Sequence, residues 1–240
     1  MRQLKRYYRS KARIIGSLAQ PLLFLIAFGF GFGPVFEKAG AGNYMQFLVP
    51  GIIAMSILFT AIFSGIELIW DKQFGFLKET LVAPKPRYKI FIGRTIGGAT
   101  ISFLQGIIVL CISFAFGFRI YSLIGVILAL LFMFLIALFF TALGTAIASV
   151  LDDMQGFHLI MNFLVMPIFF LSGALFPIES LPKGLYIVTR LNPMTYGVDG
   201  VRHALVNISG FGVLLDIAVL VALNIALILI GTKLFSRMEV

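Results

Sequence analysis

Residues that commonly carry chemistry are scarce in this sequence: among 240 residues there are one cysteine, two histidines and ten acidic residues. The single cysteine, Cys111, cannot form an intrachain disulfide, and its place inside an apolar run favours a packing role. His158 and His203 belong to separate predicted helices, and the sequence contains no H-E-x-x-H pattern. A zinc hydrolase is therefore not expected, and no catalytic or metal-binding residue is predicted.

Two further enzyme signatures are missing. The sequence has no G-x-x-x-x-G-K-S/T loop, so we expect that this chain does not hydrolyse ATP itself. The stretch around Ser172 resembles half of the G-x-S-G motif of rhomboid proteases, but Phe170 stands where the first glycine is required. A serine protease is therefore disfavoured, and no cofactor is predicted for this chain.

Charge is also scarce, and it is almost absent from six apolar runs. Charged residues make up 12% of the chain and hydrophobic residues 60%, and the mean hydropathy is +1.04. A membrane-spanning helix needs ~20 apolar residues, and the runs cover residues 16–36, 47–66, 95–118, 123–150, 157–178 and 211–232. Backbone groups in lipid must be satisfied within each segment, so runs of this length predict helices. We expect an all-α membrane protein with six transmembrane helices in a single transmembrane domain, residues 1–240.

The positive charges indicate the orientation. The first 13 residues hold six Lys or Arg and no acid, and six more lie between spans two and three. Because cytoplasmic segments are rich in Lys and Arg, we expect both termini in the cytoplasm and the protein in the cell membrane. The charges flank apolar runs, so no nucleic-acid partner is predicted. Four arginines share one side of a helix over residues 1–15, which predicts an N-terminal interfacial helix; a disordered basic tail is the alternative.

Residues 67–94, between spans two and three, are too many for a simple turn. Phe74, Leu77 and Leu81 recur at helical spacing among charged positions, and Pro84 ends the pattern. The spacing predicts a short amphipathic helix in this cytoplasmic loop. Such a helix needs another surface to hold it, so it either lies on the membrane or docks into a cytoplasmic partner.

Residues 176–210, between spans five and six, are predicted to form short re-entrant helices on the external side. Pro182 fits the start of one helix, and Asn192 followed by Pro193 is typical of an N-cap with proline at the first helical position. In the second helix Asp199 is placed to pair with Arg202 or His203. The apolar face of that helix is expected to hold Met194, Val198, Val201 and Leu205. Such helices can re-enter the outer leaflet or cover an exit.

Few ionisable groups lie within the runs, which disfavours an ion-relay mechanism. Glu67 and Asp71 stand at the cytoplasmic end of span two and Asp216 at the outer end of span six, where we expect them to be solvated. In span four, small residues recur every four positions and predict a face that another helix approaches closely. These residues are Ala137, Thr141, Thr145 and Ser149.

In two segments, residues 71–87 and 171–205, the spacing of particular residues matches that of a known family of membrane proteins. The matching positions are Gly75, Leu77, Leu81, Val82 and Pro84 in the first, and Ser172, Gly173, Phe176, Pro177, Leu181, Pro182, Asn192, Pro193, Tyr196, Asp199 and Arg202 in the second. With the six-span count, the sequence resembles the type-2 ABC exporter permeases. The resemblance implies that the first segment is the coupling helix and contacts an ATPase subunit. The implied contact residues are Phe74, Gly75, Phe76, Leu77, Lys78, Glu79 and Leu81.

The resemblance also implies the assembly. Two copies of this chain would form the pathway in the lipid bilayer, and two separate ATP-binding subunits would hold ATP and Mg. The cargo would be an amphipathic drug, a lipid or a polysaccharide, with no substrate residue predicted. The alternative is an ATP-independent membrane carrier or scaffold, although a carrier favours buried coupling charges and internal repeats that the sequence lacks.

Overall fold

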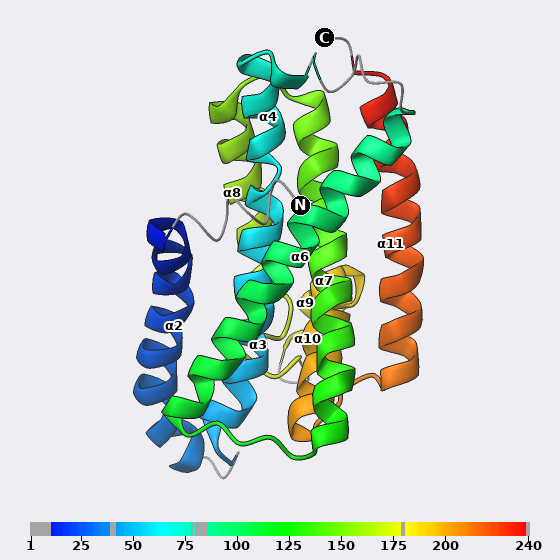
Figure 1. Ribbon diagram of the computed structural model, residues 1–240. Helices are drawn as coiled ribbons and strands as arrows, with labels where there is room; N and C mark the ends of the chain where they lie inside the picture. Colours follow the sequence, from blue (N-terminus) through cyan, green and yellow to red (C-terminus); the bar gives the residue numbers. More distant parts are fainter. Residues whose placement is uncertain (1–10, 39–41, 78, 80–85, 179–180, 239–240) are drawn as a thin grey trace.

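The computed structural model describes residues 11–38, 42–77, 79, 86–178 and 181–238, and the regular structure of these residues is entirely helical (Figure 1). The helices are α2 (Lys11–Lys38), α3 (Tyr44–Phe63), α4 (Ile66–Gln73), α6 (Arg87–Ser113) with a 3-10 turn η1 (Phe114–Phe116), α7 (Leu123–Val150), α8 (Met154–Phe170), α9 (Lys183–Leu191), α10 (Pro193–Val206) and α11 (Val213–Ser236). The predicted all-α class is confirmed for this part of the chain. The predicted interfacial helix falls largely on residues 1–10, outside the described residues.

Five helical segments are long and apolar enough to cross a membrane, which confirms five of the six predicted runs as helices. They are Gly16–Phe36, Tyr44–Gln73, Arg87–Phe116, Leu123–Val150 and Val213–Ser236. The predicted fifth span, residues 157–178, is wrong in its length: α8 has 17 residues and ends at Phe170. Gly173 has a left-handed φ of 72°, and the Ser172 hydroxyl donates to the Phe169 carbonyl oxygen, so the helix stops there.

The segment predicted as a cytoplasmic loop, residues 67–94, is helical at both of its ends. Helix α4 continues from α3 through Gln73, and α6 begins at Arg87 after Pro86, whose extended ψ of 139° fits the N-cap position. Both helices therefore continue beyond the apolar runs into parts that carry charged residues. Asp71 of α4 and Arg94 of α6 form an ion pair within these extensions.

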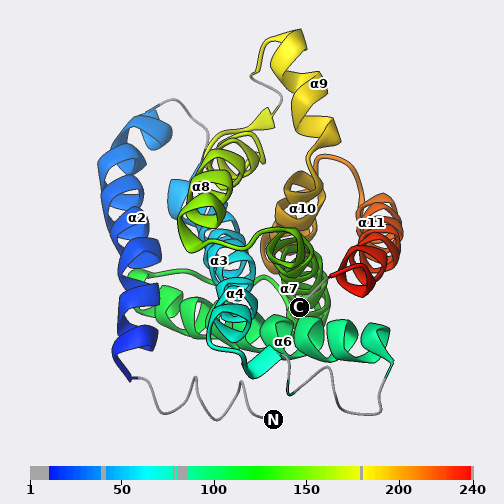
Figure 2. The ribbon, with the colours of Figure 1, turned by 90° about the horizontal axis from the view of Figure 1, so that it is seen from above.

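Helix α7 lies at the centre of the bundle and packs against α3, α6, α10 and α11. Its predicted face of small residues is buried, as expected, with side chains at most 4% exposed. A Cβ on Gly144 would lie 2.4 Å from the Ile62 carbonyl oxygen, so only glycine lets α3 and α7 come this close. Viewed along the bundle, α2 lies along one side and α9 projects from the rim (Figure 2). Cys111 is a free cysteine, exposed on α6.

Candidate functional site

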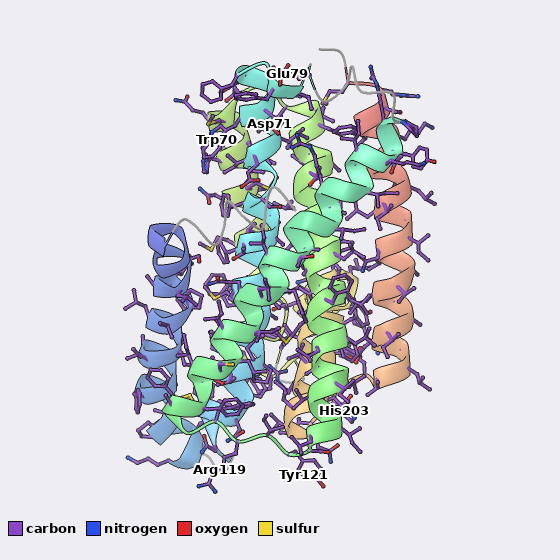
Figure 3. The ribbon with its side chains drawn as sticks, viewed as in Figure 1. Trp70, Asp71, Glu79, Arg119, Tyr121 and His203 are labelled. Carbon is purple, nitrogen blue, oxygen red and sulfur yellow. The ribbon has the colours of Figure 1, made fainter. Side chains whose placement is uncertain are left out.

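Labelled side chains mark the two ends of the bundle in Figure 3. Trp70, Asp71 and Glu79 lie at one end, here called the α4 end, and Arg119, Tyr121 and His203 lie toward the other, here called the α10 end. The described residues among those predicted to contact an ATPase subunit, residues 74–77 and Glu79, belong to the α4 end, and those predicted for the external segment belong to helix α10 and its N-cap. The sequence-predicted sites therefore fall on opposite ends.

A sharp turn at the α4 end exposes two aromatic side chains. Gly75 follows the last residues of α4 with a left-handed φ of 76°, a conformation that glycine adopts without strain. Phe74 is 71% exposed and Phe76 is 45% exposed, whereas Leu77 is fully buried. The turn therefore places two phenylalanines outward while the next leucine anchors the segment to the core.

This geometry corrects the predicted amphipathic face. Phe74 and Leu77 do not share one helix face, because the left-handed Gly75 interrupts the helix between them. Lys78 and Leu81, which complete the predicted contact set, lie outside the described residues, and Glu79 is exposed. The exposed aromatic pair, here called the Phe74/Phe76 turn, is the part of the predicted site that the structure displays.

A lysine joins α4 to the end of α7. The Lys72 Nζ donates to the carbonyl oxygens of Ser149 at 3.0 Å and Leu151 at 3.1 Å, and it pairs with the Asp152 carboxylate at 3.1 Å. The last carbonyl groups of a helix lack intrahelical donors and carry partial negative charge, so a cation stabilises them. Gln73 adds a bond from its Nε2 to the Asp152 carbonyl oxygen at 3.3 Å. Movement of α4 is thereby tied to the α7–α8 connection.

Two arginines extend this connection to α6 and α11. Arg94 pairs with Asp71, and both side chains are less than one-fifth exposed, so α4 is held to α6. The Nη1 of Arg87 donates to the carbonyl oxygens of Ser236 at 2.8 Å and Met238 at 2.9 Å, which joins the start of α6 to the end of α11. Cations therefore link α4 to α7 and to α6, and the start of α6 to the end of α11.

Glycines mark the place where α4 meets α3. Between these helices lie Ser64 and Gly65, and a Cβ on Gly65 would lie 2.5 Å from the Gly144 carbonyl oxygen of α7. The backbones therefore touch without intervening side chains.

Sequence reasoning missed the structural role of Lys72, Arg87 and Arg94, which it counted only as topology charges. Only Lys72 offered a signal, because it lies in the last turn of α4 and cations favour helix C-termini. Several of their partners, among them the carbonyl oxygens of Ser149 and Ser236, are backbone groups far away in the sequence and carry no side-chain signature. No single-sequence pattern identifies such backbone acceptors.

At the α10 end, the predicted helix starts are confirmed. Helix α9 follows Pro182, and α10 follows an Asn192 N-cap whose Oδ1 accepts from the Met194 backbone N–H at 3.0 Å, with Pro193 at the first position. The Asn192 Nδ2 also donates to the Ile168 carbonyl oxygen at 2.6 Å. The same asparagine therefore starts α10 and attaches it to the end of α8. The predicted apolar face of α10 is fully buried.

The predicted pairing of Asp199 with Arg202 or His203 is wrong. The Asp199 carboxylate accepts from the backbone N–H groups of Gly210, at 2.8 Å, and Phe211, at 2.9 Å, and so holds the connection before α11. Arg202 points elsewhere: its Nη2 donates to the Gly173 carbonyl oxygen at 2.8 Å, and its guanidinium carbon lies 3.9 Å from the Phe47 ring centroid. Asp199 binds backbone N–H groups and Arg202 binds a backbone carbonyl oxygen and an aromatic ring, so neither pairs with a neighbour on its own helix.

The other polar groups of this end also serve the fold. The Tyr196 hydroxyl donates to the Arg190 carbonyl oxygen at 2.7 Å, and the Tyr44 hydroxyl donates to that of Leu175 at 3.2 Å. Two of the acids expected to be solvated are instead buried, since Glu67 is 8% and Asp216 is 0% exposed. The carboxylate oxygens of Asp216 have no hydrogen-bond donor among the described residues, and Asp199 lies beside them.

Comparison with known proteins supplies the deciding observation: residues 1–206 match the ABC-2 type transporter family. This chain belongs to that family. It is 30% identical over 201 residues to a Cyanophora paradoxa protein named as transport permease ycf38, covering 81% of this chain and 68% of the relative. It is 30% identical over 217 residues to the inner membrane transport permease YadH of Escherichia coli strain K12, covering 90% of this chain and 84% of that protein. Nodulation protein J of Rhizobium leguminosarum bv. trifolii is 28% identical over 193 residues, covering 80% and 73%.

Family membership and fold agree on the class of protein. Several apolar helices of spanning length and a match to the ABC-2 transporter family make this chain a multi-pass membrane protein of the transport permease type. The predicted family is therefore confirmed.

Proposed function

We propose that this chain is the permease subunit of an ABC exporter, in which the α4 end faces the cytoplasm and binds a separate ATP-binding subunit. Two copies would form the pathway, and ATP and Mg would be held by the partner subunits. Helix α8, with the buried turn that follows it, would serve as the fifth of six passes, so that both termini are cytoplasmic. The cargo would be an amphipathic drug, a lipid or a polysaccharide.

The Phe74/Phe76 turn is the observation that supports this role. Exposed aromatic side chains contribute strongly to protein interfaces when a partner buries them. Here the left-handed Gly75 fixes their direction, and Leu77, buried behind them, anchors the turn. A surface that is rigid in the free protein loses little conformational entropy on binding, which favours a docking site.

The polar contacts behind the turn suggest how movement reaches the spans. A partner that binds ATP changes the permease only if its two states favour different permease conformations. Force on the Phe74/Phe76 turn would tilt α4 about Gly65, where it touches Gly144. Lys72 would transmit this tilt to α7 and α8, and the pair of Asp71 and Arg94 would transmit it to α6.

The decisive experiment is co-purification with the ATP-binding subunit in mild detergent. The variant carries Phe74→Asp and Phe76→Asp, and both changes fall on exposed side chains, so the permease should fold normally. We expect at least a tenfold loss of bound ATPase and a parallel loss of ATP-driven transport. Tyr121→Asp is the matched control, because Tyr121 is an aromatic residue, 73% exposed, at the opposite end.

Two results would contradict the proposal. Full ATPase binding by the Phe74→Asp, Phe76→Asp variant would remove the docking site from this turn. Transport by the purified chain with no ATPase present would instead favour an ATP-independent carrier. Replacing Leu77 with a charged residue is the poorer test, because Leu77 is buried and its loss would unfold the segment whatever its role.

A further inference from the structure

A cavity of about 220 Å³ lies between the first part of α2, the second half of α3, the first turn of α4, and α6. For comparison, a dry engineered cavity of ~150 Å³ is large enough to bind benzene. Six residues with polar side chains line it: Ser17, Gln20, Ser56, Thr60, Ser64 and Glu67. We propose that this cavity binds an amphiphile with a protonated amine, which enters from the membrane leaflet at the α4 end.

The lining favours a cationic hydrogen-bond donor. The Ser56 hydroxyl donates to the Ile53 carbonyl oxygen at 2.8 Å and the Ser64 hydroxyl to that of Ala61 at 2.6 Å. Their protons are thus committed, and their oxygen lone pairs are left to accept. Glu67 adds negative charge, and none of the described lining residues is Lys or Arg. An ammonium group, with several donors and a positive charge, complements these acceptors.

Glu67 has acceptor capacity for a ligand in addition to the contacts that it already makes. An ionised carboxylate has two oxygens with about four lone-pair sites, so it can accept from several donors at once. The side chain is 8% exposed and lies within a segment long and apolar enough to span a membrane. An acid in such a place is costly, and a bound cation would offset part of this cost.

The position of the cavity fits an amphiphile better than a small hydrophilic amine. Ser17 stands at the start of the apolar stretch Gly16–Phe36, so the polar lining lies where lipid headgroups would begin. The rest of the wall is apolar and includes Pro21, Phe59, Phe63 and Ile101. The ammonium would therefore lie at Glu67 while its apolar body contacts these side chains.

The shared chemistry, an alkylammonium on an apolar body, has two sources: a free lipophilic amine and the headgroup of an aminophospholipid. The site goes beyond the proposed export role, because binding requires neither ATP nor the ATP-binding subunit. Failure of amine binding and failure of ATPase docking are consequently separate results.

The test measures binding to the full chain in nanodiscs made of phosphatidylcholine, which has no primary amine. The probe is a dansyl-labelled long-chain primary amine, and its N-acetylated form is the neutral counterpart. We expect the wild-type chain to bind the amine at least tenfold more tightly than the acetylated probe. Glu67→Gln should abolish this preference, and Asp152→Asn should preserve it, because Asp152 is 93% exposed outside the cavity.

A second variant guards against misfolding of Glu67→Gln. Thr60→Trp keeps the acid and fills the cavity, so it should weaken binding of both probes at least tenfold. Equal affinity for amine and neutral probe in the wild type would overturn the proposal, as would an unchanged preference in Glu67→Gln. Added phosphatidylethanolamine identifies the source: competition indicates the lipid headgroup, and undisturbed binding indicates a free amine.

Discussion

The two ends of the bundle use polar residues in opposite ways. At the α10 end, Asp199 and Arg202 are at most 5% exposed, and their hydrogen bonds fix two connections of the chain to helix α10. At the α4 end, Lys72 and Arg94 join the ends of long helices, while Phe74 beside them is exposed. Buried, satisfied polar networks rigidify a structure. The difference indicates that the polar groups of the α10 end hold connections in place, whereas those of the α4 end join an exposed pair of aromatic side chains to several helices.

The largest effect is expected within the Phe74/Phe76 turn and its anchor. Leu77→Ala removes a fully buried side chain and should lower the free energy of unfolding by about 2–5 kcal/mol. Phe74→Ala should leave that free energy almost unchanged while weakening ATPase binding. Thermal unfolding in detergent, read alongside co-purification, separates the two. Equal destabilisation by both substitutions would mean that Phe74 also anchors the fold.

The α10 end should respond to loss of Arg202. Arg202→Ala deletes the hydrogen bond to the Gly173 carbonyl oxygen and the stacking on Phe47, so we expect a loss of about 3 kcal/mol. Arg119→Ala is the control, since Arg119 is an exposed arginine at the same end. The midpoint of thermal unfolding measures both. If the two variants unfold together, the α10 end is not held by Arg202.

At the α4 end, Lys72→Ala should cost only about 1 kcal/mol, the usual value for a cation at a helix C-terminus. Its effect on coupling should be larger: the ATPase still binds, but ATP hydrolysis drives less transport. The measurement is the ratio of transport to hydrolysis in proteoliposomes, with the exposed Lys89→Ala as control. An unchanged ratio would argue that α7 receives its movement by another route.

The smallest expected effect is a gain in the stability of the fold. Asp216 is fully buried beside Asp199 without a donor, so Asp216→Asn should stabilise the protein by about 1 kcal/mol by supplying an N–H group. Asp152→Asn, on an exposed side chain, should leave the thermal midpoint unchanged. A lower midpoint for Asp216→Asn would show that the negative charge itself is needed at the start of α11.

These comparisons show where sequence reasoning succeeds. Long apolar runs and the Asn192–Pro193 cap are local signals, because helix formation and capping depend on neighbouring residues. The partners of Asp199 and Arg202 were not predictable, because they are backbone groups of distant connections with no side-chain signature. The turn at Gly75 was misjudged for a different reason: helical spacing of apolar residues does not reveal that a glycine between them adopts a left-handed conformation.

The most direct test of the account is sided labelling of single cysteines in intact cells. On a Cys111→Ser background, Phe74→Cys and Tyr121→Cys each place one exposed thiol at opposite ends of the bundle. The account predicts that a membrane-impermeant maleimide labels the thiol at position 121 in intact cells and the thiol at position 74 only in inside-out vesicles. When the ATPase subunit is bound to these vesicles, labelling at position 74 should decrease. Labelling of position 74 from outside the cell would contradict the account.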